Sequence, residues 1–410
     1  MFQSTAQDDW PIRFADFFVT SRSGAKINFM QSTQYAGMAD SKPEGALEGQ
    51  AILLALKAHY AEIVLPIWRA AGYNPQLGLA YESVASQTAE TLAPTRYRAM
   101  ACARQLFVFA LAGELEHAGL LFKSLKERFQ DEEHGGWIFS VDPQGNPGEC
   151  KKDLYTHAFV VFAAAEYARL SGNNEALSVV DETSDLILNR FFVSSGTPGL
   201  LNAAMSADFS TVIEEPAQNP LMHLTEAWLA ARAATGDSRY DERLEELIRV
   251  VADHFNDEAT GCILELPRGT QGNRIEPGHQ FEWYFLAYGS AHPAFEATGM
   301  RESLTRAFDF AYLHGVDPIT GGVCAAVDEA GQMLDPTQRI WAQTEYLRAL
   351  ATHASFEVNA RLPGAASRFK ERFLHDRGWF ECLSADGMVS RTDMPSTTPY
   401  HLATAFLALP

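Results

Sequence analysis

The segment "GGWIFSVDPQGNPG" (residues 135–148) opens at a glycine pair, continues in apolar residues and reaches an Asp-Pro-Gln-Gly turn. Such a pattern predicts a short β-hairpin-like loop. Five other segments have the same character: "LGLAYESV" (77–84), "PGLLNAAM" (198–205), "GCILELPRG" (261–269), "GGVCAAVDEAGQ" (321–332) and "RGWFECLSADG" (377–387). Their glycines at positions 78, 136, 199, 261, 322 and 378 recur about every 60 residues. The chain therefore contains six diverged repeats.

The stretches between these loops are helical in character. Windows such as "DERLEELIRVVADHF" (241–255) are rich in Ala, Leu, Glu and Arg, with apolar residues spaced by three and four. One helical pair cannot bury its apolar stripe alone, so neighbouring units must stack. Six pairs can close into a ring or form an open superhelical array. Six units and an apolar, helical C-terminus favour closure, so we predict an all-α (α/α)6 barrel with hairpin-like loops at one end.

The repeat also sets the expected domain organisation. Residues 1–45 precede the first repeat and are expected to form an N-terminal extension packed on the barrel. Residues 46–410 contain no Pro-, Gly- or Ser-rich linker and are expected to form a single catalytic barrel domain.

Composition limits the classes of partner and location. The formal net charge of −20 and the absence of a basic stripe argue against nucleic acid. The sequence has neither a run of 18 apolar residues nor a signal-peptide pattern at its start, so we expect no membrane span and a cytoplasmic location. The five dispersed cysteines fit free thiols in a reducing compartment. A monomer or homodimer is expected.

Polar residues gather about 20 positions after each loop, where the second helix of each unit begins. Equivalent positions in a ring of helices lie at one height, so these side chains should converge at one end of the barrel. The mixture suits hydrogen bonding to a polyhydroxylated ligand and stacking on a sugar ring. The set comprises Arg98, Arg104, Tyr155, His157, Asn219, His223, Glu226, Glu276, His279, Glu282, Trp341, Gln343, Glu345, Tyr400 and His401.

Two chemistries fit this set. The pattern His-x-x-Glu occurs at His223–Glu226 and at His279–Glu282, and two such pairs on facing helices could hold a metal. No HExxH motif or EF-hand loop supports a metal, so we expect none. The other chemistry is proton transfer between adjacent carbons of a sugar, which needs a base, an acid and stabilisation of an enediolate. Facing histidines with nearby carboxylates and an arginine supply these groups without a cofactor.

Four motifs resemble the N-acylglucosamine 2-epimerase superfamily, and within it the branch of mannose and sulfoquinovose isomerases. They are "NPLMHLTEAWLAA" (219–231), "EPGHQFEWYFL" (276–286), "RIWAQTEYLRAL" (339–350) and "TPYHLATAF" (398–406), supported by "YTHAFVVFAAAEYA" (155–168). The resemblance runs from about residue 66 to the C-terminus and implies an (α/α)6 barrel, in agreement with the repeat.

The resemblance also implies roles for residues. His401 is expected to be the base that abstracts the carbon proton, and His279 the acid. The implied sugar-contacting or orienting residues are Arg104, Tyr155, Asn219, His223, Glu226, Glu282, Trp341 and Gln343. The expected activity is cofactor-free interconversion of D-mannose and D-fructose through a cis-enediolate, with a monosaccharide as substrate.

Three other activities are open on the sequence. A sugar 2-epimerase, acting on an N-acylglucosamine, a free sugar or a disaccharide, could use the same histidine pair. A glycoside hydrolase could use Glu226 and Glu282 as paired carboxylates. A non-catalytic sugar-binding protein would bind tightly without turnover.

Overall fold

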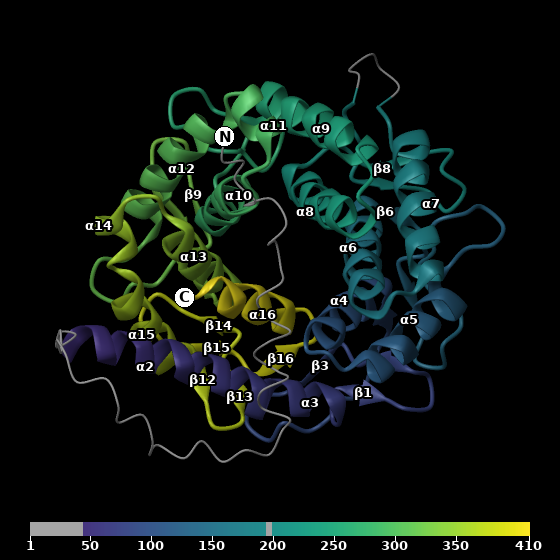
Figure 1. The fold of residues 1–410 in the computed structure, drawn as a ribbon, viewed down its shortest axis with the longest axis horizontal. Coiled ribbons are helices and arrows are strands. Elements are labelled where there is room, and N and C mark those ends of the chain that lie inside the picture. Colours follow the sequence, from purple (N-terminus) through teal and green to yellow (C-terminus); the bar gives the residue numbers. More distant parts are fainter. Residues whose placement is uncertain (1–43, 194–198) are drawn as a thin grey trace, which may run out of the picture.

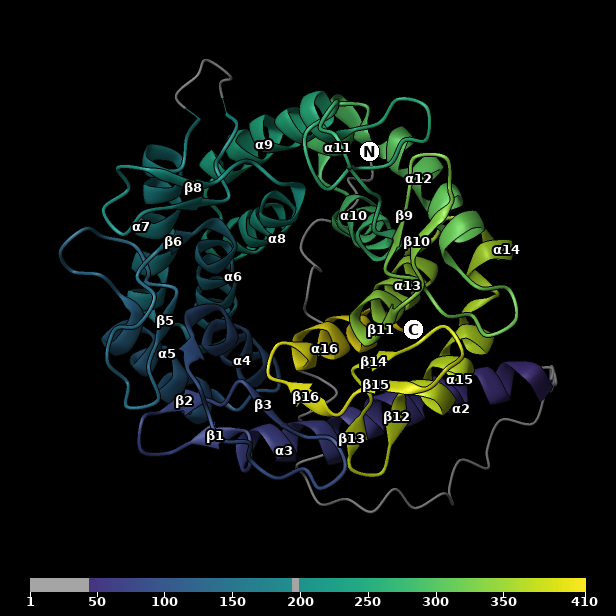
Figure 2. The ribbon, with the colours of Figure 1, turned by 180° about the vertical axis from the view of Figure 1, so that it is seen from behind.

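Two concentric rings of helices form the molecule in the computed structural model, which describes residues 44–193 and 199–410 (Figure 1). The inner ring consists of α4 (Ala99–Leu111), α6 (Leu154–Ser171), α8 (Gln218–Thr235), α10 (Pro277–Ser290), α13 (Ile340–Thr352) and α16 (Thr398–Ala408). The outer ring consists of α5 (Leu115–Phe129), α7 (Asn174–Arg190), α9 (Arg239–Phe255), α12 (Met300–Gly315), α15 (Leu362–Phe373) and the continuous run α2–η1–α3 (Glu44–His59, Tyr60–Val64, Leu65–Arg69). The predicted all-α (α/α)6 barrel is confirmed, and α16 packs against α4 to close the ring (Figure 2).

The two rings differ in sequence because they differ in burial. Inner helices are covered on all sides, and every residue of α4 is buried. Outer helices bury one stripe. In α9 the buried Tyr240, Leu244, Leu247, Val251 and Phe255 recur at spacings of three and four, as an amphipathic helix on a core requires. Short helices α11 (Pro293–Ala297) and α14 (Phe356–Asn359) lie between inner and outer partners.

The run α2–η1–α3 completes the outer ring. Within it, Gly49–Arg69 is the one helical stretch in the described chain that is long and apolar enough to cross a bilayer, although only a third of its apolar window is buried. The sequence did not predict this stretch, because Lys57 and Glu62 interrupt its apolar residues. The run packs against α15 and α16, so this segment is a wall of the barrel.

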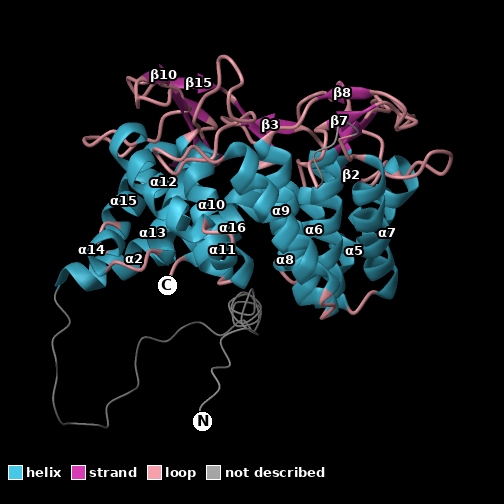
Figure 3. Cartoon of the chain, turned by 90° about the horizontal axis from the view of Figure 1, so that it is seen from above, coloured by secondary structure: helices cyan, strands magenta, loops and turns pink. Residues whose placement is uncertain are grey.

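Short strands lie at one end of the barrel (Figure 3). Local hairpins form as expected from β1 (Tyr73–Asn74) and β2 (Leu79–Ala80), β7 (Ala204–Met205) and β8 (Val212–Glu214), β9 (Ala326–Val327) and β10 (Met333–Asp335), β12 (Leu374–His375) and β13 (Gly378–Trp379), and β14 (Cys382–Leu383) and β15 (Val389–Arg391). The segment 261–269 forms no strand, so the prediction of a hairpin there is wrong. Gly261 nevertheless needs its glycine, because it has φ +77° and an added Cβ would lie 2.3 Å from the Ser303 carbonyl oxygen.

The strands also link neighbouring repeats, which the sequence did not predict. The short strand that precedes an inner helix pairs with the loop of the next repeat. These antiparallel pairs are β4 (Tyr97–Arg98) with β5 (Ser140–Val141), β6 (Lys152–Asp153) with β7, β11 (Gln338–Arg339) with β14, and β16 (Asp393–Pro395) with β3 (Ser83–Ala85). The last pair joins the sixth repeat to the first, so backbone hydrogen bonds as well as helix packing close the ring.

The predicted extension falls almost wholly on residues 1–43, which lie outside the described residues. The division at residue 45 therefore stays a prediction. From residue 46 onward the described segments all belong to the two rings and their connections.

Candidate active site

A cavity of about 420 Å³ lies where the inner helices begin, at the strand-bearing end of the barrel. The preceding strands place the first turns of the inner helices around it, which is where the sequence placed its polar residues. Its walls are formed by Arg98, Met100, Arg104, Tyr155, Asn219, His223, Glu265, Arg274, Glu276, His279, Glu282, Arg339, Trp341, Glu381, Thr397, Thr398 and His401. Eight of the ten predicted site residues are in this set, so the structure brings together side chains that are up to about 300 positions apart.

His279 stands in the first turn of α10 and is held by a carboxylate. Its Nδ1 lies 2.7 Å from Oε1 of Glu265. The Gln218 amide donates to the same carboxylate at 3.2 Å, and the Trp283 indole N–H in turn donates to Gln218 at 2.8 Å. Burial opposes the charged imidazolium, but the Glu265 carboxylate outweighs it and raises the pKa of His279 to about 9. His279 is therefore protonated at neutral pH, and its Nε2 is left for the cavity.

His401 stands in the first turn of α16 and is also held by a carboxylate. Its Nδ1 lies 2.8 Å from Oε1 of Glu345. Burial and the positive charges of Arg104 and Arg348 hold the pKa of His401 well below its usual value. With Nδ1–H donated to Glu345, Nε2 of a neutral His401 is free to accept a proton. The two histidines therefore have similar hydrogen bonds and opposite charge states.

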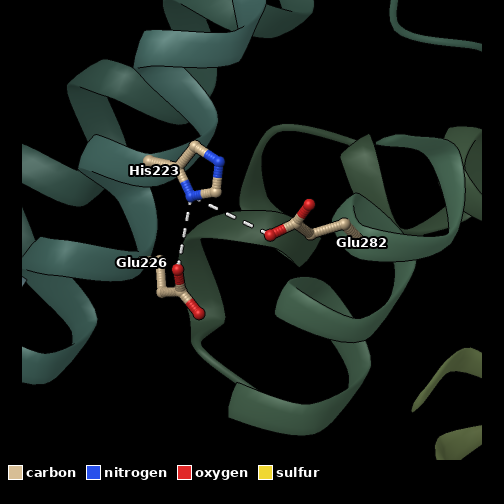
Figure 4. Close-up of side chains that lie close together, drawn as sticks. All are labelled: His223, Glu226 and Glu282. Atoms are coloured by element: carbon tan, nitrogen blue, oxygen red, sulfur yellow. Dashed lines mark hydrogen bonds and ion pairs between the residues drawn. The ribbon is translucent and has the colours of Figure 1, made fainter. Parts of the chain in front are cut away.

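His223, Glu226 and Glu282 form a third cluster (Figure 4). Nδ1 of His223 lies 3.4 Å from the Glu226 carboxylate and 3.9 Å from Oε1 of Glu282. Burial lowers the pKa of His223 to about 4, so this imidazole is neutral. Burial and the carboxylates of Glu345 and Glu226 raise the pKa of Glu282 well above its usual value. A protonated Glu282 has an O–H to donate, and its Oε1 has no hydrogen-bond partner in the described structure.

The remaining predicted contacts provide an arginine, a phenol, an amide and an indole. Arg104 donates to the Tyr155 hydroxyl and to the Thr397 carbonyl, and its guanidinium lies 4.1 Å from the centroid of the Phe159 ring. No carboxylate of the described chain lies within ion-pair distance of this buried cation. Oδ1 of Asn219 is buried and has no hydrogen-bond partner among the residues that the structure describes.

Trp341 packs against both proposed catalytic histidines. Its ring centroid lies 4.9 Å from that of His279 and 5.8 Å from that of His401. The indole thus gives the cavity an apolar wall between the two imidazoles, which suits the face of a sugar ring.

Two predicted contacts do not line the cavity. The Gln343 amide accepts from the Val323 N–H at 2.8 Å and donates to the Val323 carbonyl at 2.9 Å, so this side chain is bound to the backbone away from the cavity wall, and its contact with sugar stays a prediction. Gln280 makes the same pair of bonds to Ile263 one repeat earlier, which identifies a structural clamp. Glu226 lies behind His223, where it accepts from the Tyr400 hydroxyl and faces Arg348 at 3.6 Å. In this position it holds Tyr400 and His223 and does not line the cavity.

The sequence interpretation assigned no role to three carboxylates of the site: Glu265, Glu345 and Glu381. Glu345 stood among the polar residues of the fifth repeat. Glu265 and Glu381 occupy equivalent positions, because the residue before each, Leu264 and Phe380, donates its N–H to the last residue of the preceding outer helix at 2.9 Å and 2.8 Å. Aligning the repeats on their loops places Glu265 and Glu381 at the same position, so this alignment would identify both carboxylates from the sequence. Glu265 and Glu381 lie in the loops, whereas the polar residues identified from the sequence lie at the starts of helices.

Three groups of side chains have the donor types and the proximity to hold a metal ion: His223, Glu226 and Glu282; Glu265, Glu276 and His279; and Glu282, Glu345 and His401. Each group contains a carboxylate that already binds a protein donor. Tyr400 donates to Glu226, Arg274 to Glu276 at 2.7 Å, and Arg348 to Glu345 at 2.7 Å. These carboxylates therefore have side-chain partners without a metal. Metal independence stays a prediction.

Comparison with known proteins agrees with this geometry. Over 384 residues the chain is 27% identical to a mannose-6-phosphate isomerase of Rhizobium meliloti (strain 1021), covering 85% of this chain and 94% of that one. Over 178 residues it is 32% identical to a D-mannose isomerase of Pseudomonas cannabina pv. alisalensis, covering 39% and 41%. The structure of cellobiose 2-epimerase from Spirochaeta thermophila DSM 6192 superposes with a TM-score of 0.76 at 24% identity, covering 90% and 98%, and so shares the fold. The model of the N-acylglucosamine 2-epimerase family matches residues 82–405, so the chain belongs to this family of sugar epimerases and isomerases.

Proposed function

We propose that the protein is an aldose–ketose isomerase that interconverts D-mannose and D-fructose. The observation that carries this proposal is a pair of cavity histidines, each held at Nδ1 by a carboxylate, whose pKa values are shifted in opposite directions. His279 is held protonated by Glu265, whereas His401 is held neutral by burial and by two arginines. Moving a proton between two adjacent carbons requires an acid and a base that are present at the same time.

The reaction begins from the open-chain aldose. Neutral His401 takes the proton from C2 while His279 gives a proton to the aldehyde oxygen O1, which produces a cis-enediol. His279, now neutral, takes the proton from the C2 hydroxyl, and His401 returns its proton to C1. The product is the ketose, both histidines regain their starting charge, and no redox partner is consumed.

Arg104 stabilises the negative charge that develops on the oxygens. Its field is among the causes that lower the pKa of His401, so the guanidinium acts at the reacting end of the cavity. Because no carboxylate of the described residues neutralises it, its charge is available to an enediolate. Asn219, His223 and Glu282 supply an acceptor, an imidazole and a neutral carboxyl for the sugar hydroxyls, and Trp341 supports the ring.

A 2-epimerase is the second candidate, because two imidazoles from α10 and α16, the inner helices on either side of α13, could also exchange the C2 proton on opposite faces of the sugar. Incubation of D-mannose with the enzyme in deuterated water separates the two. The isomerase yields D-fructose, which carries deuterium at C1 to the extent that protonated His401 exchanges with solvent before it returns the proton. The epimerase yields D-glucose with deuterium at C2. Accumulation of glucose without fructose would overturn the isomerase assignment.

The assignment of the base has its own test. His401→Ala should lose deuterium exchange and turnover, while His254→Ala removes an imidazole outside the cavity and should leave both intact. Near-normal activity of the His401→Ala variant would show that another group is the base.

A glycoside hydrolase is disfavoured, because Glu226 lies behind the wall of the cavity and its carboxylate is bound by Tyr400. The proposal also includes activity without a metal, a cytoplasmic location, a monomeric or homodimeric state, and no nucleic-acid or membrane partner. Elemental analysis tests the metal, cell fractionation tests the location and membrane association, and light scattering tests the oligomeric state.

A further inference from the structure

Arg348 is a buried arginine of α13 that is 1% exposed and does not line the cavity. Its Nη1 donates to Oε2 of Glu345 at 2.7 Å, and its Nη2 lies 3.6 Å from Oε1 of Glu226. The guanidinium lies 3.9 Å from the centroid of the Phe285 ring. A buried charge is costly unless its partners offset that cost, and the acid–base steps assign this cation no task of its own.

Glu345 links this arginine to the proposed base. Oε2 of Glu345 accepts from Arg348, and Oε1 lies 2.8 Å from Nδ1 of His401. An ionised carboxylate can only accept, so a neutral His401 places its hydrogen on Nδ1 and keeps a lone pair on Nε2, the nitrogen left for the cavity.

One more proton in the hydrogen bond between Glu345 and His401 would remove that lone pair. If the proton stands on the ring, which is intrinsically the more basic partner, both nitrogens carry hydrogen. If it stands on Oε1 and is donated to Nδ1, the hydrogen of the neutral ring is on Nε2. The base is therefore available only while the Glu345–His401 pair lacks this proton.

The other histidine shows the same arrangement without a cation. Nδ1 of His279 lies 2.7 Å from Oε1 of Glu265, and the further donor to that carboxylate is the neutral Gln218 amide. No lysine or arginine nitrogen of the described chain lies within 4.0 Å of the Glu265 carboxylate. His279 is the histidine that holds the extra proton. The two histidine–carboxylate pairs thus share their geometry and differ in the arginine on the carboxylate.

We propose that Arg348 selects His401 as the base, because its charge on Glu345 keeps the extra proton off the Glu345–His401 pair. Arg348 binds Glu345 and does not line the cavity, so it is a positioning residue that acts through that carboxylate. The inference rests on the proposed isomerase function, since it names what makes one of the two histidines the base of that reaction.

Other charged and titratable groups act on the pair from the neighbouring helices. They are Arg104 of α4, His223 and Glu226 of α8, His279 and Glu282 of α10, and Tyr400 of α16. Neither Arg104 nor the His279 imidazolium lies within 4.0 Å of Glu345. Burial raises the pKa of Glu345 to about 6 in spite of Arg348, and the Glu226 carboxylate acts in the same direction as burial. Loss of the arginine should therefore favour proton uptake by the pair.

The test changes the charge and the hydrogen bond of Arg348 separately. Arg348→Gln keeps an N–H for Glu345 without the charge, Arg348→Lys keeps the charge, and Arg348→Met removes both. Arg169→Met is the matched control. Arg169 binds Glu166 at 2.7 Å on inner helix α6, with the same spacing of three residues, and neither side chain lines the cavity.

Two readouts follow the base. The first is the limb of the pH profile of kcat/KM for D-mannose that rises with pH, because His401 can accept a proton only above the pKa of the pair. The second is the set of ¹⁵N chemical shifts of the His401 imidazole, which report the nitrogen that carries hydrogen. A residue needed for stability alone would change neither readout in the folded protein.

We expect Arg348→Gln and Arg348→Met to move the rising limb up by at least one pH unit, which is a loss of about ten-fold in kcat/KM on that limb. Hydrogen should then appear on Nε2 of His401 at a pH where wild type has the lone pair. Arg348→Lys and Arg169→Met should keep the wild-type limb and the wild-type ¹⁵N shifts.

An unmoved limb with unchanged ¹⁵N shifts in folded Arg348→Gln overturns the inference, and so does an equal shift in Arg348→Lys. If Arg348→Met does not fold, Arg348→Gln decides; if neither folds, Arg348 is a residue of stability and the inference fails. The ¹⁵N shifts need no turnover. If wild type forms no fructose from D-mannose, the proposed function fails, while these shifts still decide whether Arg348 controls the proton on His401.

Discussion

The replacement Glu265→Gln tests the charge state of the proposed acid. The Gln218 amide already donates to Glu265, and a glutamine oxygen at that position still accepts the Nδ1–H of His279, so the imidazole keeps its orientation. What is lost is the negative charge 2.7 Å from the ring. We therefore expect the imidazolium of His279 to lose its main stabilisation while burial continues to disfavour it.

The size of the effect follows from the pKa. In wild type the pKa of His279 is about 9, so about nine-tenths of the molecules carry the acid at pH 8. If the pKa returns to about 6.5, only about 3% carry it at that pH, which predicts a loss in kcat/KM of about 30-fold. Below pH 6 the difference in kcat/KM between wild type and Glu265→Gln should narrow, because His279 is then protonated in both enzymes.

The assay is the pH profile of kcat/KM for D-mannose, together with an NMR titration of the imidazole. Wild-type activity should fall as pH rises through about 9, and the falling limb should move below pH 7 in Glu265→Gln. Glu276→Gln is the matched variant. The wild-type Glu276 carboxylate lies 3.9 Å from Nδ1 of His279 and is paired with Arg274, so its replacement should move the falling limb of the pH profile less. If Glu265→Gln keeps the limb near pH 9 with a native circular dichroism spectrum, Glu265 does not set the charge of His279.

Three further outcomes are expected. Gln343→Leu leaves the buried N–H and carbonyl of Val323 unpaired, so the free energy of unfolding should fall by about 2–3 kcal/mol in urea titrations while kcat/KM changes little; a large rise in KM for D-mannose would instead restore Gln343 as a sugar contact. Arg348→Met leaves the carboxylate of Glu345 without its cation and should cost about 3–5 kcal/mol of stability, as measured by the same titration; a stability equal to wild type would contradict the role of this ion pair. Dialysis against EDTA should leave turnover of D-mannose unchanged, and recovery of lost activity on adding back a divalent ion would disprove metal independence.

Much of the site was predictable because the repeat can be recognised from short sequence patterns. Short-range spacing places His223 and Glu226 on one helix face, and the recurrence of polar residues after each loop predicts that His279 and His401 meet at one end of a ring. Eight of the ten predicted residues line the cavity. The other two, Gln343 and Glu226, also lie near the start of an inner helix, but which face of that helix meets the cavity depends on how the rings pack.

The sequence alone determined the number of repeats and the helical class, and it favoured a closed ring over an open array. The repeats and helices depend on the periodicity of apolar residues and on turn glycines, which act over short distances along the chain. The candidate pair of histidines followed from the resemblance to a known family. Only the tertiary structure decided the charge of each histidine. Glu265 reaches His279 from a loop, Glu345 reaches His401 from α13, and Arg104 acts on His401 from α4. A pKa depends on burial and on charges a few ångströms away, whichever repeat they come from, so the tertiary arrangement shifts the pKa values of two similar histidines in opposite directions, as the proposed acid and base require.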